Sequence, residues 1–101
     1  MFQIKWTKKA LLDLAETLKY WNIHNSSETF SKKLRLEVKK KQLELSENPK
    51  IGIKTAFDEI YKIKILKYYS LFFRFQNDKI EILAFWDNRR IFEEFWSTVD
   101  R

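Results

Sequence analysis

The sequence has no cysteine, a single histidine and a single glycine among its 101 residues. Without cysteine, the chain cannot form disulfide bonds, a thiol nucleophile or a cysteine-based zinc site. One histidine cannot supply the pair that a histidine-pair ribonuclease needs, and we interpret His24 as a surface residue rather than a catalyst. One glycine cannot build a glycine-rich phosphate loop. These absences remove several familiar kinds of catalytic site.

The sequence also has no long apolar run and no group of acidic residues at metal-ligand spacing. The longest apolar runs, such as YYSLFF and ILAFW, reach about six residues, whereas a membrane helix needs about 20. The opening MFQIKWTKKALLDL has no apolar segment before its first charges, unlike a signal peptide. We therefore expect a cytoplasmic protein with no membrane partner. The acidic residues show no metal-ligand spacing, and adjacent Glu93 and Glu94 would diverge on a helix, so we predict no metal and no cofactor.

What is present favours one folded, basic domain spanning residues 1–101. Hydrophobic residues make up 45% of the chain and aromatic residues 17%, which is enough for a modest core. Twenty Lys and Arg residues against 14 Asp and Glu residues give a net charge of +6. Such a charge favours a polyanionic or acidic partner, although solubility alone also explains it.

Apolar periodicity predicts a strand followed by a helical hairpin. Phe2, Ile4 and Trp6 alternate with polar residues as in a strand. A helix is predicted from about Lys8 to His24, with Thr7 as its N-cap. The apolar stripe of this helix consists of Leu11, Leu14, Ala15, Leu18 and Trp21.

A second helix should follow the break at Asn25-Ser26-Ser27, which also supplies its N-cap. It should run to about Glu47 and end at Asn48-Pro49, with Gly52 just beyond. Its core stripe is Phe30, Leu34, Val38 and Leu45. A turn this short makes the two helices pack antiparallel.

Two leucines of the second helix, Leu36 and Leu43, lie one heptad apart and roughly opposite its core stripe. They are either an outer apolar seam for a partner or two ordinary surface leucines.

From Tyr61 to residue 86, the pattern predicts the strands of a sheet. Tyr61, Ile63 and Ile65 point one way, and Tyr69 to Phe75 alternate in the same manner. Residues 76–79 form a turn, residues 80–86 form the most buried strand, and residues 91–99 can pack as a short terminal helix. The predicted fold is α+β, in the order β-α-α-β-β-β with a short C-terminal helix. Its antiparallel sheet packs against the helical hairpin. Phe72 and Phe85 are expected on the less covered sheet face, where either a partner or another part of the chain buries them.

The candidate chemistry lies in cations on that sheet. Lys62 and Lys64 share one face of a strand, while Arg89 and Arg90 follow the last strand. If those strands are neighbours, the cations can converge on a phosphate. Repulsion and burial would lower a lysine pKa toward neutrality, and an arginine would stabilise a pentacoordinate phosphate. The other reading is that the two lysines are a solvated strand face.

Four segments together resemble the RelE/ParE family of bacterial toxins, the toxic halves of type II toxin–antitoxin modules. They are WTKKALLDL, LSENPKIG, YKIKILKYYSLFFRF and FWDNRR, and the resemblance spans about residues 2–96. It implies the fold described above, growth inhibition, and an acidic, partly disordered antitoxin encoded beside the toxin. Phe72, Phe85 and Trp96 are expected to contact the antitoxin or the target.

The family resemblance implies two activities. RelE-like members cleave mRNA on the ribosome without a metal, which assigns catalysis here to Lys62, Lys64 and Arg90, and phosphate or RNA binding to Arg74 and Arg89. Two positions depart from that pattern. Ser70 stands where an arginine usually follows a tyrosine, and Trp96 stands where a C-terminal tyrosine would act.

ParE-like members lack that catalytic set and poison DNA gyrase. Their long helical hairpin resembles the segment WTKKALLDLAETLKYW. Lys62, Lys64 and the net charge favour ribosome-dependent mRNA cleavage through a basic sheet face, which the sequence slightly prefers. The hairpin and the two departures favour the alternative, inhibition of gyrase without nuclease activity. A degenerate protein that binds its antitoxin without being toxic is the third reading.

Overall fold

The computed structural model describes residues 1–89 of the chain. The described part has two long helices, one short 3-10 helix and five strands. In chain order these are β1 (Gln3–Trp6), α1 (Lys8–Asn25), α2 (Thr29–Glu47), η1 (Pro49–Ile51), β2 (Ile53–Lys54), β3 (Tyr61–Ile65), β4 (Tyr69–Gln76) and β5 (Lys79–Asp87). This confirms an α+β fold with a helical hairpin after the first strand. The predicted C-terminal helix falls outside the described residues.

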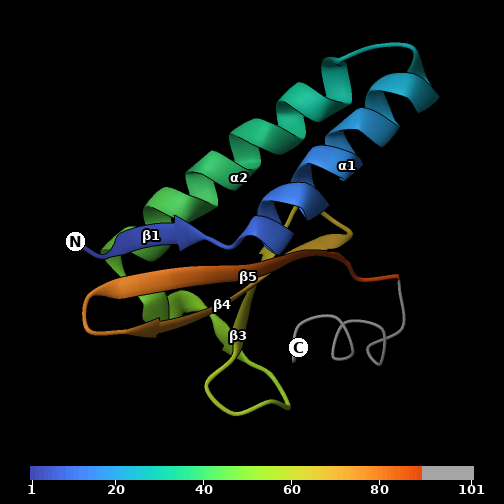
Figure 1. Ribbon diagram of the computed structural model, residues 1–101. Coiled ribbons are helices and arrows are strands. Elements are labelled where there is room, and N and C mark those ends of the chain that lie inside the picture. The colour runs from blue at the N-terminus through green and yellow to red at the C-terminus, as the bar shows by residue number, and fades with distance from the viewer. Residues whose placement is uncertain (90–101) are drawn as a thin grey trace.

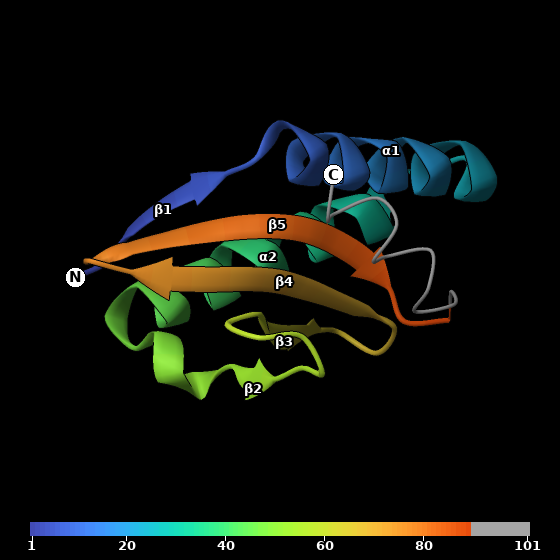
Figure 2. The same cartoon turned by 60° about the horizontal axis from the view of Figure 1, so that its bottom comes forward.

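The strands form one sheet in the order β1-β5-β4-β3-β2, and both helices pack on the same face of it (Figures 1 and 2). The pairs β2–β3, β3–β4 and β4–β5 are antiparallel, but β1 pairs parallel to β5. The expectation of a purely antiparallel sheet is therefore wrong, and β2 was not predicted. The helical hairpin brings the end of α2 back to the start of β1, where the Ser46 carbonyl accepts a hydrogen bond from the N–H of Phe2 at 2.7 Å.

Local hydrogen bonds stabilise the start of α1 and the turn between α1 and α2. The Thr7 hydroxyl accepts from the N–H of Ala10 at 3.1 Å, which confirms Thr7 as the N-cap of α1. Ser26 ends α1 in the left-handed conformation, with φ 50°. The Ser27 hydroxyl then accepts from the first amide of α2, that of Thr29, at 3.1 Å.

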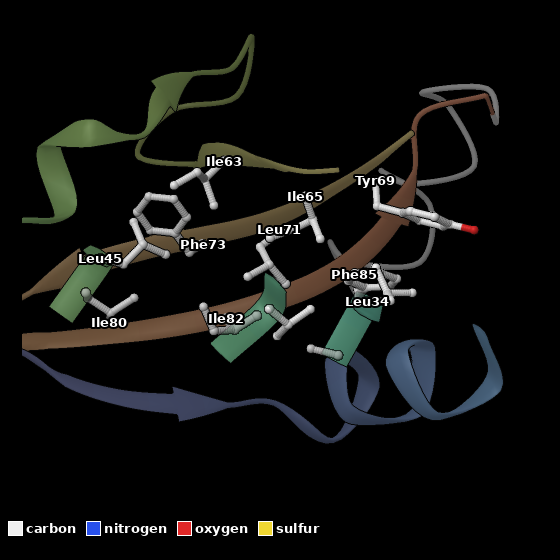
Figure 3. Packing of buried hydrophobic residues seen from close by; sticks show 12 residues of the cluster. Leu34, Leu45, Ile63, Ile65, Tyr69, Leu71, Phe73, Ile80, Ile82 and Phe85 are labelled. Atoms are coloured by element: carbon white, nitrogen blue, oxygen red, sulfur yellow. The ribbon is translucent and has the colours of Figure 1, made fainter. Parts of the chain in front are cut away.

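The main core fills the space between the helices and the sheet (Figure 3). Leu34, Val38 and Leu45 of α2 are buried in it, as their spacing predicts. The stripe predicted for α1 is only partly right, because Leu11 is 53% exposed while Ala10 is fully buried. The helical spacing of Leu14 and Leu18 fits either Ala10 or Leu11 as the next buried residue toward the N-terminus. In the structure α1 packs against β5 with Ala10 inward, so Leu11 is left exposed.

The turn between β4 and β5 is tight. Asn77 and Asp78, its two residues, have φ of 53° and 66°. Positive φ at both positions is the conformation whose twist matches a two-residue antiparallel hairpin, and Asn and Asp tolerate it. The predicted turn at residues 76–79 is thus confirmed.

A β-bulge in β5 changes which side chains face the helices. Phe72 pairs with Ala84 but Phe73 pairs with Ile82, so Leu83 has no partner of its own. Strict alternation from Ile82 would point Phe85 away from the helices. The extra residue reverses that phase, and Phe85 joins the main core with Leu34 (Figure 3).

Candidate functional site

The second face of the sheet, opposite the helices, carries Lys62, Lys64, Ser70, Phe72 and Arg74. Lys62 pairs with Phe72, and Lys64 pairs with Ser70. Alternate residues of one strand lie about 7 Å apart along it, so the two ammonium groups lie side by side. Neither forms an ion pair with another residue of the described range 1–89. Lys62 is half-buried and Lys64 exposed. The sequence thus placed both lysines on the correct face.

Arg74 shares this face but is engaged by Glu81 on β5. Its Nε and one terminal nitrogen both lie 2.7 Å from Glu81 Oε1. Arg74 and Glu81 are paired across the two strands. A phosphate that bound Arg74 would have to compete with this carboxylate or displace it.

Ser70 contributes no charge to the face. Its side chain is buried, and its hydroxyl donates to Asn88 Oδ1 at 3.0 Å. The amide of Asn88 also donates to the carbonyl of Tyr68 at 2.6 Å. Ser70 therefore ties the end of β5 to β4.

Phe72 lies at the centre of a small apolar cluster on the second face. Ala84 and Trp86 are its buried neighbours, and Phe57 and Ile60 pack against them. The last two come from the loop between β2 and β3, which Thr55 closes by donating to the Ile60 carbonyl at 2.8 Å. Phe72 is only 1% exposed, so other parts of the chain cover it.

Phe85 does not share that face, and the expectation that it lies beside Phe72 is wrong. It is 4% exposed within the main core and stacks on Tyr69, with ring centroids 5.1 Å apart. The β-bulge at Leu83 is the cause, because it reverses the alternation of β5 before Phe85. Neither phenylalanine offers an exposed surface to a partner.

Arg89 lies away from the two lysines. β4 separates β3 from β5, so the strands that carry them are not neighbours. The Arg89 guanidinium donates to both carboxylate oxygens of Asp87, at 2.9 and 2.7 Å, and lies 4.6 Å from the ring centroid of Tyr68. Hydrogen bonds to Asp87 raise the pKa of Arg89 above its ordinary value. The strands that lead to Arg89 and to the two lysines are thus not neighbours, although the predicted convergence on one phosphate assumed that they were. Arg90 and Trp96 lie outside the described residues.

Arg89 instead lines a hollow of about 480 Å³ on the helix side of the sheet, which the sequence did not indicate. Trp21 donates its indole N–H to the Tyr69 hydroxyl at 2.7 Å in this hollow. Asp13 accepts from the amide of Phe85 at 3.2 Å and from Lys9 at 2.7 Å. The lining residues are Asp13, Glu16, Thr17, Tyr20, Trp21, Tyr69, Phe85, Asp87 and Arg89. They come from α1, β4, β5 and the segment directly after β5, so no local motif reveals them.

Other candidate chemistry is sparse in the described part. His24 is exposed near the end of α1 and stacks on Tyr20, with ring centroids 5.3 Å apart. No group of three or more acidic, histidine or cysteine side chains within residues 1–89 could hold a metal ion. Over the same range, no helix combines the length and apolar content that crossing a membrane requires.

Comparison with known proteins identifies the family. Residues 4–92 match the family model described as "ParE toxin of type II toxin-antitoxin system, parDE". A search of curated proteins found no match. Among solved structures, one described as "Chromosomal ParDE TA system from P. aeruginosa" is similar with a TM-score of 0.70 and 19% sequence identity. The match covers 86% of this chain and 96% of the other. Because the family model spans most of its length, the chain belongs to the family of ParE toxins of type II toxin–antitoxin systems.

Proposed function

We propose that this ParE-family toxin arrests growth by inhibiting DNA gyrase, and that it does so through protein contacts rather than by cleaving RNA. One observation carries the proposal: the cations predicted to form one site do not all lie on neighbouring strands, because β4 separates β3, which carries Lys62 and Lys64, from β5, which leads to Arg89.

Metal-free RNA cleavage needs several cations around one phosphate, to accept a proton and to stabilise the additional charge. On the second face, Arg74 is held by Glu81 and the position of Ser70 is neutral and buried. Arg89 is held by Asp87 on the helix side. Of the four site cations predicted within residues 1–89, only Lys62 and Lys64 have no carboxylate partner there, which favours the gyrase mechanism.

Ribosome-dependent mRNA cleavage is the second candidate. It is favoured by Lys62 and Lys64, which lie one pleat apart and form no ion pair within residues 1–89. In that mechanism they would be catalytic together with Arg90, while Arg74 would bind RNA after release from Glu81.

The partner that neutralises the toxin is proposed to be an acidic antitoxin encoded beside it. The net charge of +6 provides the electrostatic attraction for such a partner. Gyrase and the ribosome both act in the cytoplasm, which is the compartment we propose for this toxin.

The test measures both activities with the same protein preparations. Purified wild type and the Lys62→Ala/Lys64→Ala variant are titrated into a gyrase supercoiling reaction. They are also added to a reconstituted translation system, in which primer extension maps cuts in a defined mRNA. We expect both proteins to block supercoiling equally and to leave the mRNA intact.

Discrete ribosome-dependent cuts that disappear in the lysine variant would overturn the gyrase proposal and establish RNA cleavage. Loss of gyrase inhibition in the lysine variant, with its fold retained by circular dichroism, would show that the lysines belong to the gyrase contact. A wild-type protein inactive in both reactions, and without effect on growth, would identify a degenerate protein that only binds its antitoxin.

A further inference from the structure

The hollow of about 480 Å³ on the helix side of the sheet has acidic and aromatic walls. We call it the α1 hollow, because five of its lining residues belong to that helix. Its volume lies in the range of small-molecule sites. Its charged lining groups are three carboxylates and one guanidinium, whereas the whole chain has a net charge of +6. The local charge is opposite in sign to that of the chain, which favours a cation as occupant.

Two of the three carboxylates are already paired, and one is not. Asp87 binds Arg89 through both of its oxygens. Asp13 binds Lys9 at 2.7 Å but accepts only through Oδ2, so its Oδ1 has no hydrogen bond within residues 1–89. Glu16 is exposed and forms no ion pair over the same range. The hollow therefore offers unused carboxylate oxygens, which accept hydrogen bonds.

The aromatic walls add a flat apolar surface to these acceptors. The rings of Tyr20 and Trp21 have centroids 5.0 Å apart and stand nearly perpendicular, at 84°. The Tyr69 side chain is 4% exposed, with its hydroxyl at the end that points away from the core (Figure 3). That hydroxyl accepts from Trp21, but its own proton has no acceptor among residues 1–89. A buried hydroxyl with unused capacity needs a partner from within the hollow.

The structure already holds one guanidinium in this manner at the side of the hollow. Arg89 donates to the carboxylate of Asp87 and lies 4.6 Å from the ring centroid of Tyr68. A carboxylate beside an aromatic ring suits a guanidinium, which is planar and donates through several N–H groups. Glu16 and Tyr20 lie four residues apart on α1, so they present the same combination one helical turn apart.

We propose that the α1 hollow binds the guanidinium group of a small cation or of an arginine side chain. The guanidinium donates to Glu16 and to the free oxygen of Asp13, and its plane lies against the Tyr20 and Trp21 rings. A simple ammonium lacks the flat surface, and an anion would meet three carboxylates. The hollow lies on the other side of the sheet from Lys62 and Lys64. The inference is therefore independent of whether the toxin acts on gyrase or on mRNA.

The probe is n-butylguanidinium, and n-butylurea is its neutral counterpart of nearly the same shape. The reporter is the indole N–H of Trp21 in the ¹⁵N-labelled full-length protein, because it donates to Tyr69 within the hollow. The NMR spectrum of Trp21→Phe assigns this signal among the four tryptophans. We expect n-butylguanidinium to shift it saturably, with weaker binding at high salt, and n-butylurea to leave it unchanged.

Two variants of exposed residues test the walls of the hollow. Glu16→Gln should lower the affinity for n-butylguanidinium about fivefold or more, because it removes the unpaired carboxylate. Tyr20→Leu should lower it about threefold, because it removes one aromatic wall. The matched control is Glu47→Gln, which removes the same charge from an exposed glutamate of α2 outside the hollow and should bind as the wild type does. Circular dichroism verifies that each variant is folded.

An equal shift with n-butylurea, or an equal loss of affinity in Glu47→Gln, would overturn the proposal. A Trp21 signal that does not respond to n-butylguanidinium in the folded wild type would overturn it as well. Two further probes distinguish the sources of the guanidinium. Tighter binding of arginine capped at both ends would support the site and identify an arginine side chain of another protein. Tighter binding of agmatine, which has no backbone groups, would support the site and identify a free small molecule.

Discussion

The two faces of the sheet are built from the same strands but differ in what holds their side chains in place. On the helix side, Ile63, Leu71 and Phe73 belong to a continuous core that reaches Leu34 and Leu45 on α2. On the second face, the described buried cluster consists of Phe72, Ala84 and Trp86, with cations around it.

The difference shows where packing determines the sequence and where it leaves the sequence free. Substituting a fully buried side chain of the first face leaves a cavity or a clash, so few residues fit there. The lysines of β3 are subject to no such demand. Their presence is therefore better explained by a contact or by solubility than by folding.

The largest effect is expected where the helix-side core is opened. Phe73→Ala removes a fully buried ring and should lower the free energy of unfolding by about 3–5 kcal/mol. Phe72→Ala, its neighbour on the second face, should cost less because a smaller cluster can close around the gap. Guanidinium chloride unfolding, followed by circular dichroism, measures both. Equal losses would remove the energetic distinction between the two faces.

Adding one methyl group at Gly52 should also disturb the helix-side core. A Cβ at this position would lie 2.4 Å from Cζ of the buried Phe73 ring, closer than real contacts allow. We expect Gly52→Ala to cost about 1–3 kcal/mol, since the ring cannot move freely in a packed core. Thermal unfolding measures the loss, and Phe73→Leu in the same chain should recover part of it. A neutral Gly52→Ala would contradict this packing.

A smaller effect is expected at Asp13, which connects α1 to the end of β5. Asp13→Ala leaves the amide of Phe85 without its acceptor and should cost about 1–2 kcal/mol. Asp13→Asn keeps an oxygen at that position and should cost less. Urea unfolding compares the two with Glu16→Ala, an exposed neighbour expected to be neutral. Identical values for Asp13→Ala and Asp13→Asn would rule out the hydrogen bond as the source of stability.

The smallest change in stability is expected from the lysines of the second face. Lys62→Ala/Lys64→Ala should alter the free energy of unfolding by less than about 0.5 kcal/mol per site, because neither ammonium group has a partner in the described part. Chemical unfolding at low and high salt measures this. A substantial loss would show that the lysines are structural and would weaken any functional reading of them.

Much of the fold could be predicted because local patterns were strong. The stripe of α2, the Thr7 cap, the Asn77-Asp78 turn and the alternation of β3 all depend on neighbouring residues. The prediction failed where the side to which a side chain turns, or the direction of a strand, depended on contacts between residues far apart in the sequence. The bulge at Leu83 turned Phe85 inward, and β1 paired parallel to β5.

In the candidate site too, the features set by local alternation were predicted and those set by distant contacts were not. Alternation alone placed Lys62 and Lys64 on one face, but the position of Arg89 depended on strand order and on its contact with Asp87. The hollow beside Arg89 is assembled from α1, β4 and β5, so it has no signature along the chain.

The sequence by itself determined the two long helices, four of the five described strands, the positive charge and the pair of lysines, because periodicity and composition are properties of short segments. Only the tertiary structure decided which cations share a surface, since strand order and one extra residue in β5 set the side to which each side chain turns. It also decided which side of α2 is buried, because a helix buries only the side that meets the sheet.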